Sequence, residues 1–153
     1  MTIRNKSILA TVSLLILFMI QASSCKPDLR DDAIPYLTFG SVYMNLNLPE
    51  YTSLKTDGGF YYYDDAGVRG LIIYRQNAST YHVYERNCSF QPNEACATVN
   101  VHVTRLFMED PCCQSHFDFI TGNPTQGAAW RPLRKYFSAV NGTDLTITDE
   151  IIQ

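Results

Sequence analysis

Hydrophobic and polar residues alternate in several segments of the chain, which is the pattern of half-buried β-strands. Two further segments, Phe60–Tyr63 and Gly70–Tyr74, are aromatic or β-branched runs bounded by turn-forming residues. No segment beyond the N-terminal apolar run keeps a helical period for more than two turns. The pattern predicts an all-β fold of antiparallel strands, a sandwich or a barrel. The alternating apolar positions are Val42, Met44, Leu46 and Leu48; Val99, Val101 and Val103; and Leu145 and Ile147.

The N-terminus carries a different pattern, a short apolar run behind two basic residues. Arg4 and Lys6 precede Ile8–Ile20, a run of 13 residues without a charge. As a helix this run would span only about 20 Å, less than the roughly 30 Å hydrocarbon core of a membrane. We therefore predict that residues 1–24 are a signal peptide and not a permanent membrane span.

The residues that follow the apolar run, Ala22–Cys25, resemble the bacterial lipobox, with Ala22 where leucine is usual. Cleavage there would leave Cys25 as the first mature residue and the site of lipidation. The other interpretation is an ordinary secretory signal peptide followed by an incidental cysteine. We predict a lipoprotein anchored in the cell envelope of a Gram-negative bacterium, facing the periplasm or the cell surface. Residues 25–33 would form a tether and residues 34–153 a single domain.

The charge of the mature chain excludes two classes of partner. Loss of the leader removes Arg4 and Lys6 but no acidic residue, which leaves 10 basic and 15 acidic side chains and a net charge of −5. A mildly acidic domain without a basic run offers no surface for nucleic acid or for anionic lipid headgroups. The membrane is therefore expected as a partner only through the N-terminal lipid.

Four further cysteines fall into two loops, each preceded by a predicted strand. Cys88 and Cys96 lie in the first loop, and Cys112 and Cys113 lie in the second. In an oxidising compartment outside the cytoplasm, these thiols are expected to form two disulfides. Four cysteines allow three pairings, and the one that joins the adjacent Cys112 and Cys113 is disfavoured by disulfide geometry. Lipidation of Cys25 accounts for the odd total of five.

The segment Val83–Ile147 resembles the Rieske iron–sulfur domain. Tyr84–Phe90 corresponds to the family's first cluster loop, and Asp110–Asp118 corresponds to its second. The resemblance implies a Rieske-like fold of the ISP domain type, in which three antiparallel sheets carry two loops that hold a 2Fe–2S cluster. The most specific matches follow the second loop and are Thr121–Gly122, Gly127–Ala129, Arg131–Leu133, Tyr136 and Gly142–Ile147.

The cluster ligands do not carry over with the resemblance, because a Rieske cluster needs two cysteines and two histidines. The ungapped alignment, which we favour, places Cys88 on a cysteine ligand, Phe90 on a histidine, Asp110 on a cysteine and Cys113 on a histidine. A shift of three residues would align Cys113 and His116 with the second ligand motif, but it breaks the later matches. Both alignments leave Phe90 at a ligand position, and a phenyl ring has no lone pair for iron. No cofactor is therefore favoured.

The resemblance also implies a disulfide pairing. Cys112 stands where Rieske proteins of the cytochrome bc type carry a non-ligand cysteine, whose partner late in the first loop would be Cys96. Cys88 and Cys113 would then remain on opposite loops at the vacated cluster position. We predict that they close a second disulfide there.

Two metal-binding alternatives remain open. An electron-transfer protein could hold a 2Fe–2S cluster through Cys88, Cys113 and His116, with Asp110 or an unidentified group as the fourth ligand. A zinc or iron–sulfur site could instead combine His116 with Cys112 and Cys113. The other histidines are less suggestive. His102 is expected on the solvent face of its strand, and His82 in a packing or surface role.

The sequence contains no recognisable catalytic set. Ser89 and Ser115 lie outside any nucleophile motif, and no glycine-rich loop leads from a strand into a helix. Paired acids such as Glu109–Asp110 are interpreted as turn residues with solvated charge. The aromatic residues Phe60–Tyr63, Tyr74, Tyr81 and Tyr84 could form a sugar-binding platform, or they could fill and rim the core. We predict a non-enzymatic envelope protein with a structural role or one in binding a protein or glycan.

Overall fold

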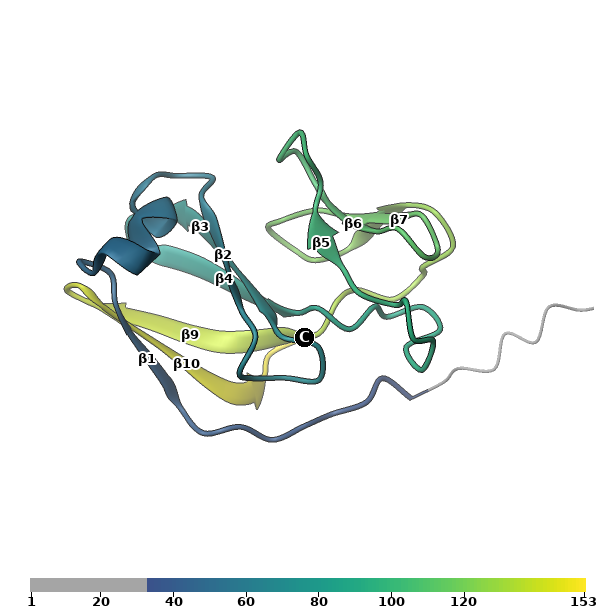
Figure 1. The fold of residues 1–153 in the computed structure, drawn as a ribbon, viewed down its shortest axis with the longest axis horizontal. Helices are drawn as coiled ribbons and strands as arrows, with labels where there is room; N and C mark the ends of the chain where they lie inside the picture. Colours follow the sequence, from purple (N-terminus) through teal and green to yellow (C-terminus); the bar gives the residue numbers. More distant parts are fainter. Residues whose placement is uncertain (1–32) are drawn as a thin grey trace, which may run out of the picture. The chain divides into compact units, whose positions relative to one another are not determined.

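The computed structural model describes residues 33–153, which form ten β-strands and one short 3₁₀-helix (Figure 1). The predicted leader, Cys25 and the tether up to residue 32 lie outside the described residues. No helix among the described residues is long and apolar enough to cross a membrane. The elements are β1 (Val42–Asn45), η2 (Pro49–Lys55), β2 (Phe60–Tyr63), β3 (Leu71–Asn77), β4 (Thr80–Glu85), β5 (Asn100–Val101), β6 (Met108–Asp110), β7 (Ser115–Phe117), β8 (Pro124–Gln126), β9 (Lys135–Asn141) and β10 (Asp144–Ile151).

The larger sheet has six antiparallel strands in the order β1-β10-β9-β4-β3-β2. It consists of two three-stranded halves, because β4 and β9 are joined through only two residue pairs, Val83 with Tyr136 and Tyr84 with Lys135. Strand β1 pairs with β10 so that Met44 lies opposite Leu145. Both side chains are buried, as the alternating pattern predicted.

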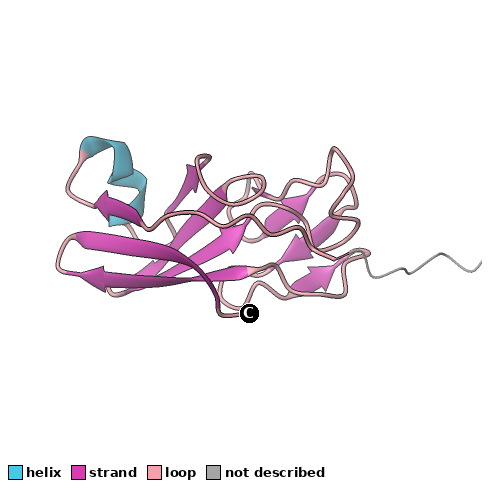
Figure 2. Cartoon of the chain, turned by 90° about the horizontal axis from the view of Figure 1, so that it is seen from below, coloured by secondary structure: helices cyan, strands magenta, loops and turns pink. Residues whose placement is uncertain are grey.

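The smaller sheet has four antiparallel strands in the order β5-β6-β7-β8 and carries the second cysteine loop. Figure 2 shows that strands and loops make up the described chain apart from the one short helix. The resemblance implied three sheets, whereas the described residues form two. The physical reason is the short β4–β9 junction, which merges two three-stranded halves into one hydrogen-bonded sheet. The all-β, antiparallel architecture that the sequence predicted is confirmed.

Two hydrophobic clusters form the core. One is built on the larger sheet and includes Leu54 of η2. The other joins the two sheets, because Ile72 and Tyr84 of the larger sheet pack in the same cluster as Met108 and Phe117 of the smaller one. Cys88 belongs to this second cluster, which therefore supports the cysteine loops from beneath.

Two of the predicted strands are too long. Strand β1 ends at Asn45, and Leu48 is 46% exposed because Pro49 starts the 3₁₀-helix η2. Strand β5 ends at Val101, and Val103 is 88% exposed in the turn that leads to β6. In both places a short alternation continued past the last hydrogen-bonded residue, and turn geometry replaced the strand.

Candidate functional site

The candidate site lies where two loops meet at the edge of the smaller sheet. The first loop, residues 86–99, connects β4 to β5, and the second loop, residues 111–114, is the turn of the β6–β7 hairpin. A disulfide between Cys96 and Cys112 joins the two loops, as the resemblance implied. Both of its residues are exposed, so this disulfide lies on the outer side of the loop pair.

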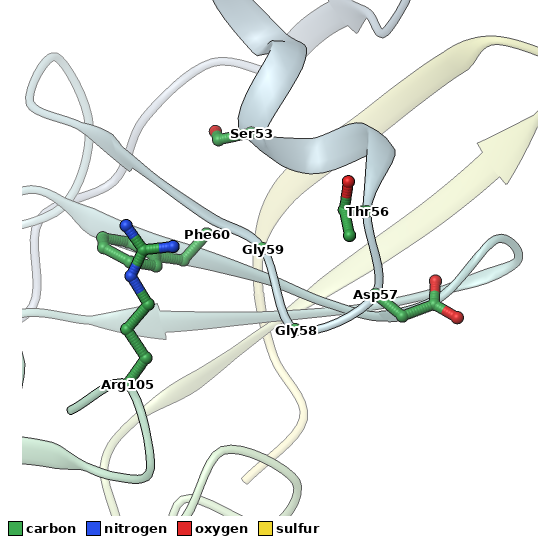
Figure 3. A pocket seen from close by; sticks show the side chains of 7 residues that line it. All are labelled: Ser53, Thr56, Asp57, Gly58, Gly59, Phe60 and Arg105. Atoms are coloured by element: carbon green, nitrogen blue, oxygen red, sulfur yellow. The ribbon is translucent and has the colours of Figure 1, made fainter.

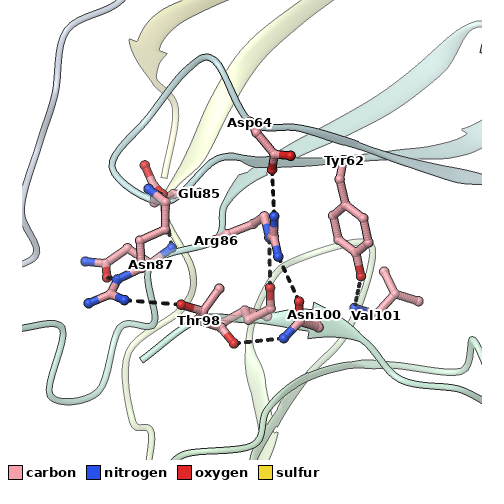
Figure 4. Close-up of polar contacts among 10 residues, drawn as sticks. Tyr62, Asp64, Glu85, Arg86, Asn87, Thr98, Asn100 and Val101 are labelled. Carbon is pink, nitrogen blue, oxygen red and sulfur yellow. Dashed lines mark hydrogen bonds and ion pairs between the residues drawn. The ribbon is translucent and has the colours of Figure 1, made fainter. Parts of the chain in front are cut away.

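Two arginines hold the first loop in place, and neither belongs to a motif that marks it in the sequence. Arg86 donates to Asp64 at 2.8 Å and to Asn100 at 2.8 Å, and its guanidinium lies over the ring of Tyr62 (Figure 4). Arg69 donates to the backbone carbonyls of Glu94 at 2.6 Å and Ala95 at 2.7 Å. These contacts fix the loop on both sides of the hydrogen-bonded bridge between Asn87 and Thr98.

A buried carboxylate, that of Glu85, ties the start of the first loop to the larger sheet. It is fully buried at the end of β4 and accepts hydrogen bonds from the backbone amides of Val68, Arg69 and Asn87. The hydroxyl of Tyr136 on β9 donates to it at 3.2 Å. Because four donors replace its water shell, this carboxylate can be buried without a charged partner. Its role is to position the residue that precedes Cys88.

The side chains of Cys88, Asp110 and Cys113 converge at one point where the two loops meet. The Sγ atoms of Cys88 and Cys113 lie 3.8 Å apart, and the Sγ of Cys113 lies 3.3 Å from Oδ2 of Asp110. Ligand atoms of all three residues lie within 4.8 Å of one another. Cys88 and Asp110 are fully buried, whereas Cys113 is half-buried. We name Cys88, Asp110 and Cys113 the thiol–carboxylate group.

The prediction for Asp110 is wrong. As one of the adjacent acids Glu109 and Asp110 it was expected to be a solvated turn residue, but its side chain is completely buried. Its Oδ1 accepts from the amide of Cys112 at 2.9 Å, and its Oδ2 accepts from the thiol of Cys113. Within residues 33–153 no ion pair includes Asp110. Burial, together with the neighbouring Asp110, raises the pKa of the Cys88 thiol, which is therefore protonated at neutral pH.

The second expected disulfide is not formed in the structure. Cys88 and Cys113 are both free, and their sulfur atoms stand 3.8 Å apart instead of the roughly 2.05 Å of a disulfide. The single S–H hydrogen of Cys113 can point to Ser115 Oγ at 3.1 Å or to Asp110 Oδ2 at 3.3 Å. The sulfur of Cys88 accepts from the backbone amide of Phe90 at 3.5 Å, so each sulfur has a hydrogen-bond partner without a bond between them.

His116 does not join the thiol–carboxylate group, so the metal set of Cys88, Cys113 and His116 is wrong for this structure. Side chains alternate along β7, and the buried Ser115 and Phe117 flank a half-buried His116 on the opposite face. The imidazole stacks on Phe107 at 4.1 Å and lies 3.9 Å from a carboxylate oxygen of Glu109. The proposed set with Cys112 and Cys113 fails for a second reason, since Cys112 is in a disulfide.

The remaining histidines occupy packed positions. His102 is half-buried and stacks on the other face of Phe107 at 4.3 Å, so it is not a free solvent-facing side chain. His82 is buried and its Nε2 lies 2.7 Å from Gln76 Oε1. Burial, with the nearby positive charge of Lys135, lowers the pKa of His82 to about 4. This fits the packing role expected for His82.

The aromatic residues considered as a sugar platform mostly belong to the core. Tyr81 and Tyr84 are buried, and Phe60–Tyr63 and Tyr74 are half-buried. The Tyr84 hydroxyl donates to the carbonyls of Phe119 and Ile120. A ring that is buried and hydrogen-bonded in this way cannot stack on a sugar, whereas the half-buried rings of Phe60–Tyr63 and Tyr74 rim the core.

The segment after β7, which carries the most specific sequence matches, contacts both loops. Ser115 Oγ accepts from the amide of Ala129 at 2.9 Å, and Ser89 exchanges hydrogen bonds with Arg131. Gly127 has φ +92°, and a Cβ there would lie 2.5 Å from Cα of Ser115. Only glycine allows this close approach beneath the second loop. Ser89 and Ser115 are thus structural residues in this site.

A cavity of about 470 Å³ lies elsewhere, between the end of η2, the start of β2 and the β5–β6 turn (Figure 3). Asp57 on its wall pairs with Arg75, and Arg105 lies over the ring of Phe60. Its charged side chains are thus engaged with the protein itself, and it holds no cysteine or histidine. The remaining lining residues are Ser53, Thr56, Gly58 and Gly59.

A comparison with solved structures found proteins similar to this domain. A chain of the complex of reduced oxygenase and oxidized ferredoxin in carbazole 1,9a-dioxygenase is 16% identical, with a TM-score of 0.50 over 77% of this chain and 96% of that one. The ferredoxin of carbazole 1,9a-dioxygenase from Nocardioides aromaticivorans IC177 is 17% identical, with a TM-score of 0.45 over 75% and 98%. No family model and no curated protein matches the chain. The domain has a Rieske-like fold, as the sequence resemblance predicted.

The residues at the loop junction do not fit a 2Fe–2S cluster, the group that the fold implies. Such a cluster needs four protein ligands, two on each iron. The thiol–carboxylate group offers three donors. Phe90, at the fourth position, is half-buried and packs against the second hydrophobic cluster with Cys113. A hydrophobic ring thus stands where the family has a histidine.

Proposed function

We propose that this chain is a lipid-anchored envelope protein whose Rieske-like domain carries no 2Fe–2S cluster and has a structural or binding role. The packing of Phe90 at a ligand position carries the proposal, because it removes a donor and fills part of the space. The disulfide between Cys96 and Cys112 supports residence in an oxidising compartment. The lipobox-like segment ending at Cys25 supports the anchor.

The electron-transfer alternative has a specific requirement. It needs a fourth ligand besides Cys88, Asp110 and Cys113, and His116 faces the other side of β7. The similarity to ferredoxin structures supports the fold and supplies no ligand for this chain. We therefore favour the cluster-free role.

An absorption spectrum of the full chain, extracted from its own envelope and purified without reductant or chelator, tests the proposal. The cluster-free role predicts no visible bands and no acid-labile sulfide. Reddish protein with equal amounts of iron and sulfide would favour the electron-transfer alternative instead.

The anchor is tested by metabolic labelling with fatty acid, which should label the wild type and leave the Cys25→Ala variant unlabelled. Equal labelling of the wild type and the variant would contradict lipidation at Cys25.

The β5–β6 turn supports the binding part of the role. Val103 and Leu106 on this turn are 88% and 77% exposed, an unusual position for two large apolar side chains so close in sequence. A protein partner that covers them is the form of binding that this surface favours. A photo-crosslinker at Leu106 should then give adducts in the native envelope that the same group at the exposed Glu150 does not give. Identical adducts from both positions would contradict a specific contact.

A further inference from the structure

The thiol–carboxylate group has the composition and spacing of a site for one thiophilic metal ion. Two sulfur ligands placed about 2.3 Å from a tetrahedral Zn²⁺ lie about 3.8 Å from each other. The sulfur atoms of Cys88 and Cys113 are 3.8 Å apart. A sulfur ligand and a carboxylate oxygen on the same ion lie about 3.5 Å apart, and Cys113 Sγ is 3.3 Å from Asp110 Oδ2.

The environment of Asp110 points to a cation as well. This carboxylate is fully buried and has an amide and a thiol as its hydrogen-bond donors, with no basic side chain in an ion pair within residues 33–153. Burial of an ionised carboxylate is unfavourable unless a charge or strong donors compensate it. Glu85, the other fully buried carboxylate near the loops, has four donors and therefore needs no cation.

Oxidation of the two thiols would leave Asp110 worse compensated. A disulfide between Cys88 and Cys113 would remove the S–H group of Cys113 that now donates to Oδ2. It would also require the two sulfur atoms to approach by about 1.8 Å inside a packed cluster. A metal ion keeps the observed separation, takes the place of the two thiol protons and places positive charge beside the carboxylate.

We propose that Cys88, Asp110 and Cys113 bind a single Zn²⁺ ion at the junction of the two loops. The fourth coordination position is open to water, because Cys113 is half-buried. On binding, two S–H protons are released and two zinc–sulfur bonds form, without oxidation or reduction. The inference rests on the proposed function to the extent that a 2Fe–2S cluster would occupy the same residues.

Metal analysis of the full chain, purified from its envelope without reductant or chelator, tests the site. One zinc per chain is expected. After removal of zinc under reductant, one equivalent of Co²⁺ should produce sulfur-to-cobalt charge-transfer bands. Cys113→Ser and Asp110→Asn should each weaken Co²⁺ binding by at least about tenfold, since even the loss of an outer partner costs about 10–100-fold. Far-ultraviolet circular dichroism confirms that each variant is folded.

His116→Asn is the matched control, because His116 lies next to the second loop but faces away from the group. It should bind Co²⁺ with wild-type affinity and spectrum. Zinc-free protein with a Cys88–Cys113 disulfide, or Co²⁺ bands that survive Cys113→Ser, would overturn the zinc site alone. Two irons and two sulfides per chain would overturn both the zinc site and the proposed function.

Discussion

The Sγ atoms of Cys88 and Cys113 lie 3.8 Å apart although 25 positions separate the residues in the sequence. Two separate structural features bring these sulfur atoms together. The first loop is fixed by Glu85 and by the arginines Arg69 and Arg86, and the second is the tight turn of the β6–β7 hairpin. The domain thus has a loop junction fixed by many contacts, at which only three of the four protein ligands of an iron–sulfur cluster are present.

The Cys96–Cys112 disulfide should contribute most of its stabilisation through the unfolded chain. It closes a loop with a sequence separation of 16, for which chain entropy gives about 3 kcal/mol. The double variant Cys96→Ser/Cys112→Ser should lose about this much free energy of unfolding in urea denaturation. Reductant should bring the wild type to the same value and leave the double variant unchanged. If reductant leaves the free energy of unfolding of the wild type unchanged, the Cys96–Cys112 pairing is contradicted.

The Glu85→Gln variant should be strongly destabilised. An amide group presents N–H donors where three backbone amides and the Tyr136 hydroxyl now donate to a carboxylate, so buried donors would face each other. We expect a loss of about 3 kcal/mol in the free energy of unfolding. Tyr136→Phe removes one of these donors and should cost only about 1 kcal/mol. Glu150→Gln, on an exposed side chain, is the control and should be neutral within about 0.5 kcal/mol.

Alanine substitutions at two glycines with similar φ angles distinguish the cost of a steric clash from the cost of a left-handed backbone. Gly122 has φ +71°, and a Cβ there would lie 2.6 Å from Cε1 of Tyr84, whereas Gly142 has φ +62° and open space around it. Gly142→Ala should cost only the left-handed backbone penalty of about 1 kcal/mol. Gly122→Ala should cost clearly more, about 3 kcal/mol, because the buried Tyr84 must also move. If the two variants lose equal free energy of unfolding in thermal or urea denaturation, the Tyr84 ring moves aside without a cost and the predicted clash is wrong.

The buried His82 makes stability depend on pH. Its pKa is about 4 in the folded state and about 6.5 in the unfolded chain, so the unfolded chain binds the proton more strongly between these values. The contribution is complete above pH 6.5 and is lost as the pH falls toward 4. From pH 7 to pH 5 we expect a loss of about 1–2 kcal/mol. His82→Gln should show a smaller decrease over this interval, and an equal decrease would assign the pH dependence to other groups.

The sequence predicted the fold better than it predicted the site. Alternation identified Val42, Met44, Leu145 and Ile147 as buried strand positions, because a period of two follows directly from strand geometry. It could not mark the ends of β1 and β5, where hydrogen bonding stops before the alternation does.

The site depended on information that periodicity does not contain. The Cys96–Cys112 pairing followed from the family resemblance, but the direction in which His116 faces depends on the register of the β6–β7 hairpin. Glu85 and Arg69 gave no local signal, since their partners are mostly backbone groups of distant segments. The pairing of Glu109 with Asp110 in the sequence concealed the burial of Asp110.

Native mass spectrometry of the intact chain from its own envelope tests the central claim most directly, because one spectrum separates the possible states of the loop junction. The account predicts a chain mass that includes the Cys96–Cys112 disulfide and one zinc ion, with no added sulfide. A mass that includes two irons and two sulfides would contradict the claim that this Rieske-like domain carries no cluster.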